Sequence, residues 1–163
     1  MGIFNNNISK TFRKLRTLIT LPPERRWLTA EALVLPALIS ACFKLFGVAR
    51  TQAWLRRCAR VGASLEPGDA VRAVREARRA QQIVRRSTGM GGSCLVRSLS
   101  LWTMLLRRGL TTEIRVGLRR REGKIEGHAW IEYRGVPINE DEKIVQTYDV
   151  YERPVSFDVK CWR

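Results

Sequence analysis

Cys94 and His128 are the two residues of this sequence that could together carry out covalent catalysis. Cys94 follows Ser93 at the start of an apolar pattern with helical spacing, so we expect it in the first turn of a helix. Unpaired backbone N–H groups and the positive end of the helix dipole stabilise a thiolate there, and the thiolate is the reactive form of cysteine. His128 is the only histidine of the chain. A neutral imidazole beside the thiol could take its proton and later protonate a leaving amine.

A third group is needed to orient the imidazole through its other ring nitrogen. If residues 134–135 form a two-residue hairpin turn, His128 lies opposite Asp141. If the loop is one residue longer, with a glycine bulge, the register shifts and His128 lies opposite Glu140. Asn139 is a weaker option, because an amide orients the ring without stabilising its charge as a carboxylate does. The turn therefore decides which carboxylate faces the ring.

Taken separately, each of these residues has an ordinary structural explanation. A cysteine at a helix start is more often a packed small residue, and a lone histidine on a half-buried strand is more often a satisfied structural group. Their order along the chain is more informative. A cysteine on a helix start, then a histidine on a strand, then a carboxylate is the order that papain-like and transglutaminase-like sites require. The combination favours a Cys94–His128–carboxylate site.

The cysteines and glycines give no sign of a metal site or a nucleotide cofactor. The four cysteines include no CxxC pair, and one histidine cannot complete a Cys/His zinc site of usual spacing, so no metal is expected. The Gly-rich stretch 87–93 lacks the Gly-Lys-Ser/Thr ending of a phosphate loop, so no cofactor is expected there. Scattered cysteines and the absence of a cleavable signal predict a reducing, cytoplasmic setting.

Helical spacing in the first half and strand alternation in the second predict an α+β fold. Residues 1–89 are expected to form a basic helical region, with helices over residues 51–61 and 69–86. Residues 90–163 are expected to form a transglutaminase/papain-like catalytic core of one helix packed on an antiparallel β-meander. That helix should cover residues 94–108, end at Gly109 and pack on the sheet face that carries His128. Strands are expected over residues 111–118, 125–133, 136–140 and 144–150.

The net charge of +15 is concentrated in the first half of the chain. Residues 1–90 carry 17 basic and 5 acidic side chains, whereas residues 91–163 carry 13 and 10. The arginines over residues 69–86 interleave with apolar residues, which is typical of a solvated helix face. No zinc-finger spacing, aromatic string or helix-turn-helix accompanies them, so nucleic acid is not an expected partner. We expect these helices to dock an acidic peptide, a partner protein or a membrane surface.

Residues 27–48 form a strongly apolar segment that Glu31, Pro36 and Lys44 interrupt. The twelve uncharged residues between Glu31 and Lys44 fall short of the roughly 20 apolar residues of a spanning helix. We expect a buried helix, or two helices hinged at Pro36. The alternative is an interfacial helix that docks on a partner or makes peripheral membrane contact, helped by basic residues just upstream.

Several stretches of the sequence resemble the transglutaminase-like cysteine peptidases of lasso-peptide biosynthesis. The resemblance is specific over residues 90–142, with Cys-Leu-x-Arg-Ser from Cys94 and Gly-His-Ala-Trp from Gly127 at matching positions. It is looser over the arginine-rich half, which begins with Pro23-Glu-Arg-Arg. Members of this family remove the leader from a ribosomally made precursor so that a cyclase can close a macrolactam.

The resemblance implies that Cys94 is the nucleophile, His128 the base and Glu140 the group that orients the ring. The family usually has an aspartate at the position that matches Glu140, so this sequence departs there by one methylene. Either Glu140 reaches the ring with its longer side chain or the neighbouring Asp141 takes the role, and Glu140 is favoured. The resemblance also implies a precursor peptide as substrate, a separate leader-recognition protein that presents it, and the macrolactam-forming cyclase as a further partner. Two other classes stay open: a transglutaminase-like acyl transferase, and a non-catalytic basic binding or membrane-surface protein.

Overall fold

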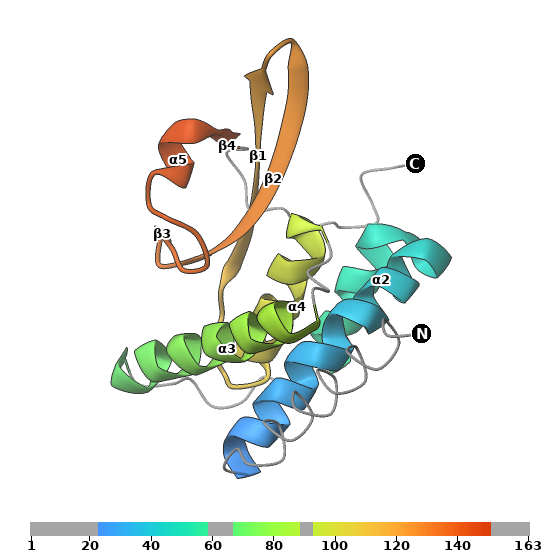
Figure 1. The fold of residues 1–163 in the computed structure, drawn as a ribbon, viewed down its shortest axis with the longest axis vertical. Coiled ribbons are helices and arrows are strands. Elements are labelled where there is room, and N and C mark those ends of the chain that lie inside the picture. Colours follow the sequence, from blue (N-terminus) through green and yellow to red (C-terminus); the bar gives the residue numbers. More distant parts are fainter. Residues whose placement is uncertain (1–22, 59–66, 89–92, 151–163) are drawn as a thin grey trace, which may run out of the picture.

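The computed structural model describes residues 23–58, 67–88 and 93–150, which form a helical part followed by a small antiparallel sheet (Figure 1). The long helices are α2 (Pro23–Cys58), α3 (Pro67–Thr88) and α4 (Cys94–Leu106). The sheet contains β1 (Glu113–Arg121), β2 (Lys124–Tyr133), β3 (Val136–Pro137) and β4 (Asp149–Val150), with the short helix α5 (Ile144–Thr147) before β4. The predicted α+β fold is confirmed. The basic stretch before residue 23 and the Gly-rich residues 89–92 lie outside the described residues.

The central helix, α4, begins and ends at the signals that the sequence carries. The Ser93 side chain accepts the Val96 N–H over 3.4 Å, which caps the helix start. At the other end Gly109 adopts φ 79°, and the Leu110 N–H donates to the Leu105 carbonyl over 3.0 Å. Nearly all of α4 after its first turn is buried. This helix therefore forms the middle of the core, with α2, α3 and the sheet around it.

α2 turns one face to the core and leaves the other exposed. Its buried residues recur at helical spacing and include Leu28, Ala32, Leu35 and Ile39. Glu31, which interrupts the apolar segment in the sequence, lies on the inner side and pairs with Arg107 and Arg108 just after α4, over 3.1 and 2.8 Å. The charge thus joins α2 to the end of α4. The exposed large apolar side chains of α2 are Trp27, Val34, Leu38, Leu45, Phe46 and Trp54.

Of the two alternatives expected for the apolar segment, the hinge at Pro36 is wrong, because α2 continues through this residue and the break lies at Gly47. Gly47 has φ 77° and ψ 171°, a conformation that only glycine adopts readily.

By length and composition the helix from Arg26 to Cys58 could cross a membrane, and 17% of its most apolar window is buried. Core helices of soluble proteins can be equally long and apolar.

The sheet departs from the expected meander in its last strand. Its order is β3-β2-β1-β4, so the chain crosses over after β3 and adds β4 beside β1. The prediction of a strand over residues 144–150 is wrong for its first part, where α5 forms. The Asp141 carboxylate accepts the Lys143 N–H over 2.9 Å, and such a local bond favours a turn over an extended chain. In Figure 1, α5 lies beside the β1–β2 hairpin, whose far end projects beyond the helices.

The helix α4 packs on the sheet face opposite to the one that carries His128. The expectation that α4 packs on the same face as His128 is therefore wrong. Side chains alternate along a strand, and Ile131 pairs across the hairpin with Ile114, so both share one face. These two isoleucines belong to the core cluster that contains the α4 leucines. His128, three residues from Ile131, points to the other face. α4 approaches His128 around the edge of β2 that the short β3 leaves uncovered, where the Ser98 hydroxyl donates to the Ala129 carbonyl over 2.9 Å.

Candidate active site

His128 and Glu140 are in direct contact. The distance from His128 Nε2 to Glu140 Oε1 is 3.2 Å, and the two side chains are 19% and 29% exposed. A carboxylate at Nε2 holds the proton on that nitrogen and fixes the orientation of the ring. Nδ1 is then the ring nitrogen with an acceptor lone pair. His128 is thereby arranged to take a proton at Nδ1.

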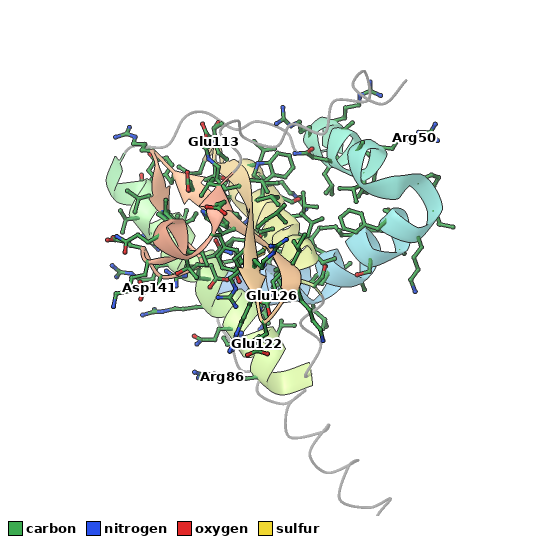
Figure 2. All side chains as sticks on the ribbon, turned by 90° about the horizontal axis from the view of Figure 1, so that it is seen from above. Arg50, Arg86, Glu113, Glu122, Glu126 and Asp141 are labelled. Carbon is green, nitrogen blue, oxygen red and sulfur yellow. The ribbon has the colours of Figure 1, made fainter. Side chains whose placement is uncertain are left out.

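The turn before β3 has two residues, yet Asp141 does not reach the ring. Residues 134–135 both adopt positive φ, as the two-residue hairpin requires. This register would place Asp141 opposite His128 if β3 continued, but β3 ends at Pro137. The Ile138 N–H still donates to the Ile131 carbonyl over 2.9 Å, whereas the Ile131 N–H is taken by the Asn139 side chain, so the ladder stops there. Asp141 is exposed at the periphery of the molecule (Figure 2). The chain leaves the strand direction, and Glu140 meets the imidazole instead.

Asn139, the third orienting candidate, joins strand and helix. Its Oδ1 accepts the Ile131 N–H over 2.8 Å, and its Nδ2 donates to Ser98 Oγ over 3.3 Å. Ser98 in turn bonds the carbonyl of Ala129, the residue after His128. Asn139 and Ser98 therefore hold α4 against the strand that carries the histidine.

Cys94 is the first residue of α4 and is half-buried. Arg97 and Ser98 lie three and four residues further on, so they share its side of the helix. Ser98 bonds the carbonyl next to His128, and Arg97 Nη2 lies 4.0 Å from Glu140 Oε1. The first turn of α4 thus faces the His128–Glu140 pair. Among the described residues the Cys94 thiol makes no hydrogen bond, to the imidazole or elsewhere. Such bonds often form only when substrate is bound.

Two backbone N–H groups at the start of α4 are available to an anion. The Val96 N–H is used by the Ser93 side chain, and the Arg97 N–H donates to the Ser93 carbonyl over 3.1 Å. The N–H groups of Cys94 and Leu95 have no acceptor within the described part of the chain. Donors in this position can stabilise an oxyanion that forms next to the thiol.

Aromatic side chains support the imidazole on its sheet face. The ring centroid of His128 is 5.4 Å from that of Tyr148 and 6.4 Å from that of Trp130, and both pairs are stacked. Trp130 Nε1 donates to Glu132 over 2.9 Å, and Arg115 donates to the same carboxylate over 3.0 Å. The neighbours of the imidazole are therefore fixed in position themselves.

Gly117, the residue of β1 paired with His128, leaves room for this aromatic cluster. A Cβ at position 117 would lie 2.7 Å from Tyr148 Cβ and 3.0 Å from Trp130 Cη2. Both contacts are too short, and neither neighbour can move without shifting the stack around the imidazole. The absence of a side chain at Gly117 is thus a condition for the observed position of His128.

An open cleft of about 630 Å³ adjoins the His128–Glu140 pair. This volume lies within the usual range of about 300–1,000 Å³ for binding pockets. Cys94 is not among the described residues that line it, although Arg97, one turn further along α4, is. The lining comes from α2, α3, α4, β2 and the chain after β3: Ala32, Pro36, Val71, Val74, Arg75, Arg78, Arg79, Gln81, Gln82, Val84, Arg85, Arg97, His128, Asn139 and Glu140.

A comparison with protein families decides the class of the chain. A model of the Transglutaminase-like superfamily matches residues 40–153, which is most of the sequence. The chain belongs to the transglutaminase-like superfamily. The match runs from within α2 to just beyond β4, so it includes the helix that begins with Cys94, the strand that carries His128 and the loop that carries Glu140. Transglutaminase-like proteins usually have cysteine protease or acyl transferase activity.

Two further comparisons gave no match, one with curated proteins and one with solved structures. Among the described residues of this transglutaminase-like chain, no group of three or more His, Cys, Asp and Glu side chains could hold a metal ion.

Sequence reasoning missed four residues that shape the site: Ser98, Arg97, Tyr148 and Gly117. Arg97 and Ser98 could have been found from their positions three and four residues after Cys94, on the same side of the helix. A glycine inside an alternating strand often marks a close approach, which was the signal for Gly117. Tyr148 gave no signal, because it comes to the site through the crossover to β4.

Substituting Gly117 tests the support of the imidazole. Gly117→Ala should lower the free energy of unfolding by about 1–3 kcal/mol, because the new methyl group overpacks the Tyr148–Trp130 contact. It should also change the near-ultraviolet circular dichroism of these aromatic rings. Gly127→Ala is the matched control in the same hairpin, since a Cβ there meets only the Leu118 side chain, at 3.4 Å. Equal stability of the two variants would show that the close approach at Gly117 carries no strain.

Proposed function

We propose that this chain is a cysteine peptidase that removes the leader from a ribosomally made lasso-peptide precursor. The observation that carries the proposal is the contact of His128 with Glu140 at the first turn of the helix that begins with Cys94. Membership of the transglutaminase-like superfamily supports thioester chemistry at such a site. The similarity of the segments around Cys94 and His128 to lasso-peptide leader peptidases supports the choice of substrate.

In the proposed mechanism His128 Nδ1 takes the proton of the Cys94 thiol. The thiolate then attacks the carbonyl carbon at the junction of leader and core, and the new oxyanion accepts the Cys94 N–H, with the Leu95 N–H as a second donor. His128 gives its proton to the departing amine as the C–N bond breaks, which leaves the leader as a thioester. Water, deprotonated by His128, hydrolyses this thioester and releases the thiol. Glu140 stabilises the imidazolium in both halves of the reaction.

The same proposal extends to partners and location. A separate leader-recognition protein presents the precursor, and the macrolactam-forming cyclase takes the freed core, whose new amine it requires. These proteins would act together in the cytoplasm. A contact of the apolar face of α2 with a membrane surface would be compatible with this arrangement.

Removal of the nucleophile is the direct test of the chemistry. With a lasso-peptide precursor and its leader-recognition protein, Cys94→Ala should abolish leader removal while leaving the far-ultraviolet circular dichroism unchanged. Cys42→Ala is the control and should retain activity, because Cys42 is a half-buried residue of α2 and is not among the described residues that line the cleft. Mass spectrometry of the products separates the two transglutaminase-like chemistries. A leader ending in a free carboxylate indicates hydrolysis. A leader joined to an amine would show that the chain is an acyl transferase and not a peptidase.

Variants of two neighbouring carboxylates distinguish a specific role of Glu140 from a general effect of negative charge near the site. Glu140→Gln should lower kcat by about 10²–10⁴-fold, because the imidazolium loses its charged partner while the ring keeps a hydrogen-bond acceptor. Asp141→Asn removes the same charge one residue away and should change kcat by less than about threefold, since this exposed side chain bonds only the local turn. A greater loss in Asp141→Asn than in Glu140→Gln would contradict the assignment.

A further inference from the structure

We infer that the cleft beside His128 binds an acidic segment of the substrate peptide through a row of arginines on α3. The inference rests on the proposed function for the identity of the bound molecule as substrate, but its physical basis is separate. It concerns the charge of the cleft walls, not the chemistry of Cys94. The row consists of Arg75, Arg78, Arg79 and Arg85, which all line the cleft.

The four arginines of this row form a continuous strip on one side of α3. Their spacing along the helix is three, one and six residues, which keeps them within about a third of the helix circumference. From Arg75 to Arg85 the strip is about 15 Å long, at about 1.5 Å per residue. An extended peptide covers this length with about five residues. Arg97 continues the positive wall toward Glu140 at the site itself.

The arginines of the row form no ion pairs within the described part of the chain. In the part of the chain that the structure describes, no carboxylate lies within 4.0 Å of Arg75, Arg78, Arg79 or Arg85. Elsewhere arginines are paired, as Arg119 is with Glu126 over 2.6 Å. Glu140 is the only acidic residue among the described residues that line the cleft, and it faces His128. Five guanidinium groups around one carboxylate leave a strong positive potential in a concave site, where field lines concentrate.

The other surfaces of the cleft select a peptide over two other kinds of anion. Its floor is made of small and branched apolar side chains, Ala32, Pro36, Val74 and Val84. No Phe, Tyr or Trp is among the described lining residues, whereas proteins that bind single-stranded nucleic acid stack the bases on such rings. A membrane surface is flat and does not enter a cleft of about 630 Å³. An extended peptide with carboxylate side chains fits the shape, the apolar floor and the charge. Arginine binds carboxylates in two-pronged pairs, which favours this class further.

A binding measurement that needs no cleavage tests this inference. The probe is fluorescein-labelled hexaglutamate, titrated with the full chain carrying Cys94→Ala at about 0.15 M salt, where the Debye length is about 8 Å and distant charges are screened. The double variant Arg78→Gln/Arg85→Gln should raise the Kd about tenfold, since each lost charged pair is worth roughly a factor of three. The control, Arg72→Gln/Arg86→Gln, removes the same charge from the same helix outside the cleft. In Figure 2, Arg86 projects outward at the end of α3.

The control pair should change the Kd by less than about threefold, and hexaglutamine should bind much more weakly than hexaglutamate. Equal losses in the two double variants would reduce the attraction to net charge and overturn the inference. Tighter binding of hexathymidylate than of hexaglutamate, lost in the same cleft variant, would assign the cleft to nucleic acid and also overturn it. If the chain with Cys94 intact cleaves no precursor but hexaglutamate binding still depends on Arg78 and Arg85, the proposed peptidase function fails while this binding site stands.

Discussion

The buried hydrogen bond from the Ser98 hydroxyl to the Ala129 carbonyl is the contact on which the rest of the site depends. It fixes the first two turns of α4 at the uncovered edge of β2, one residue from His128. Asn139 completes the junction by bonding both Ser98 and the Ile131 N–H, so the chain that carries Glu140 is tied to the same place. A nucleophile on a helix, a base on a strand and a carboxylate on a loop are thereby held by one small polar network. In a dry environment such a network is strongly directional, because every unmade bond is costly.

The helical half and the aromatic cluster hold this junction from two sides. α2 and α3 pack against α4, and Glu31 of α2 binds the two arginines that follow α4. On the other sheet face, Tyr148 and Trp130 stack beside the imidazole. The basic character of the chain has a structural explanation in part, since Arg107, Arg108, Arg115 and Arg119 are paired with carboxylates. The arginines of α3 that line the cleft are different, because they face the space where a substrate would lie.

Much of this arrangement could be predicted from the sequence where the physics is local. The cap at Ser93, the stop at Gly109 and the two-residue turns follow from residues that act on their own neighbours. The site could be predicted less completely. Which carboxylate meets His128 depends on how the chain leaves β3, where the Asn139 side chain takes the Ile131 N–H. The face on which α4 packs depends on the whole core. The crossover that brings Tyr148 to the imidazole joins residues far apart in the chain, and no local pattern encodes it. The break at Gly47 is also local, since glycine readily adopts the positive φ found there, whereas local signals could not decide between a hinge and a continuous helix at Pro36.

The central claim is that the sulfur of Cys94, at the start of α4, reacts with substrate under the control of the His128–Glu140 pair. Acid quenching of the full chain during leader removal, followed by mass spectrometry, tests it most directly by searching for the acyl intermediate. The account predicts that the peptide containing Cys94 gains the mass of the leader as a thioester, and that Glu140→Gln slows the appearance of this adduct. Leader removal at full rate with Cys94 never modified, or with the adduct on Cys42 or Cys58, would contradict it.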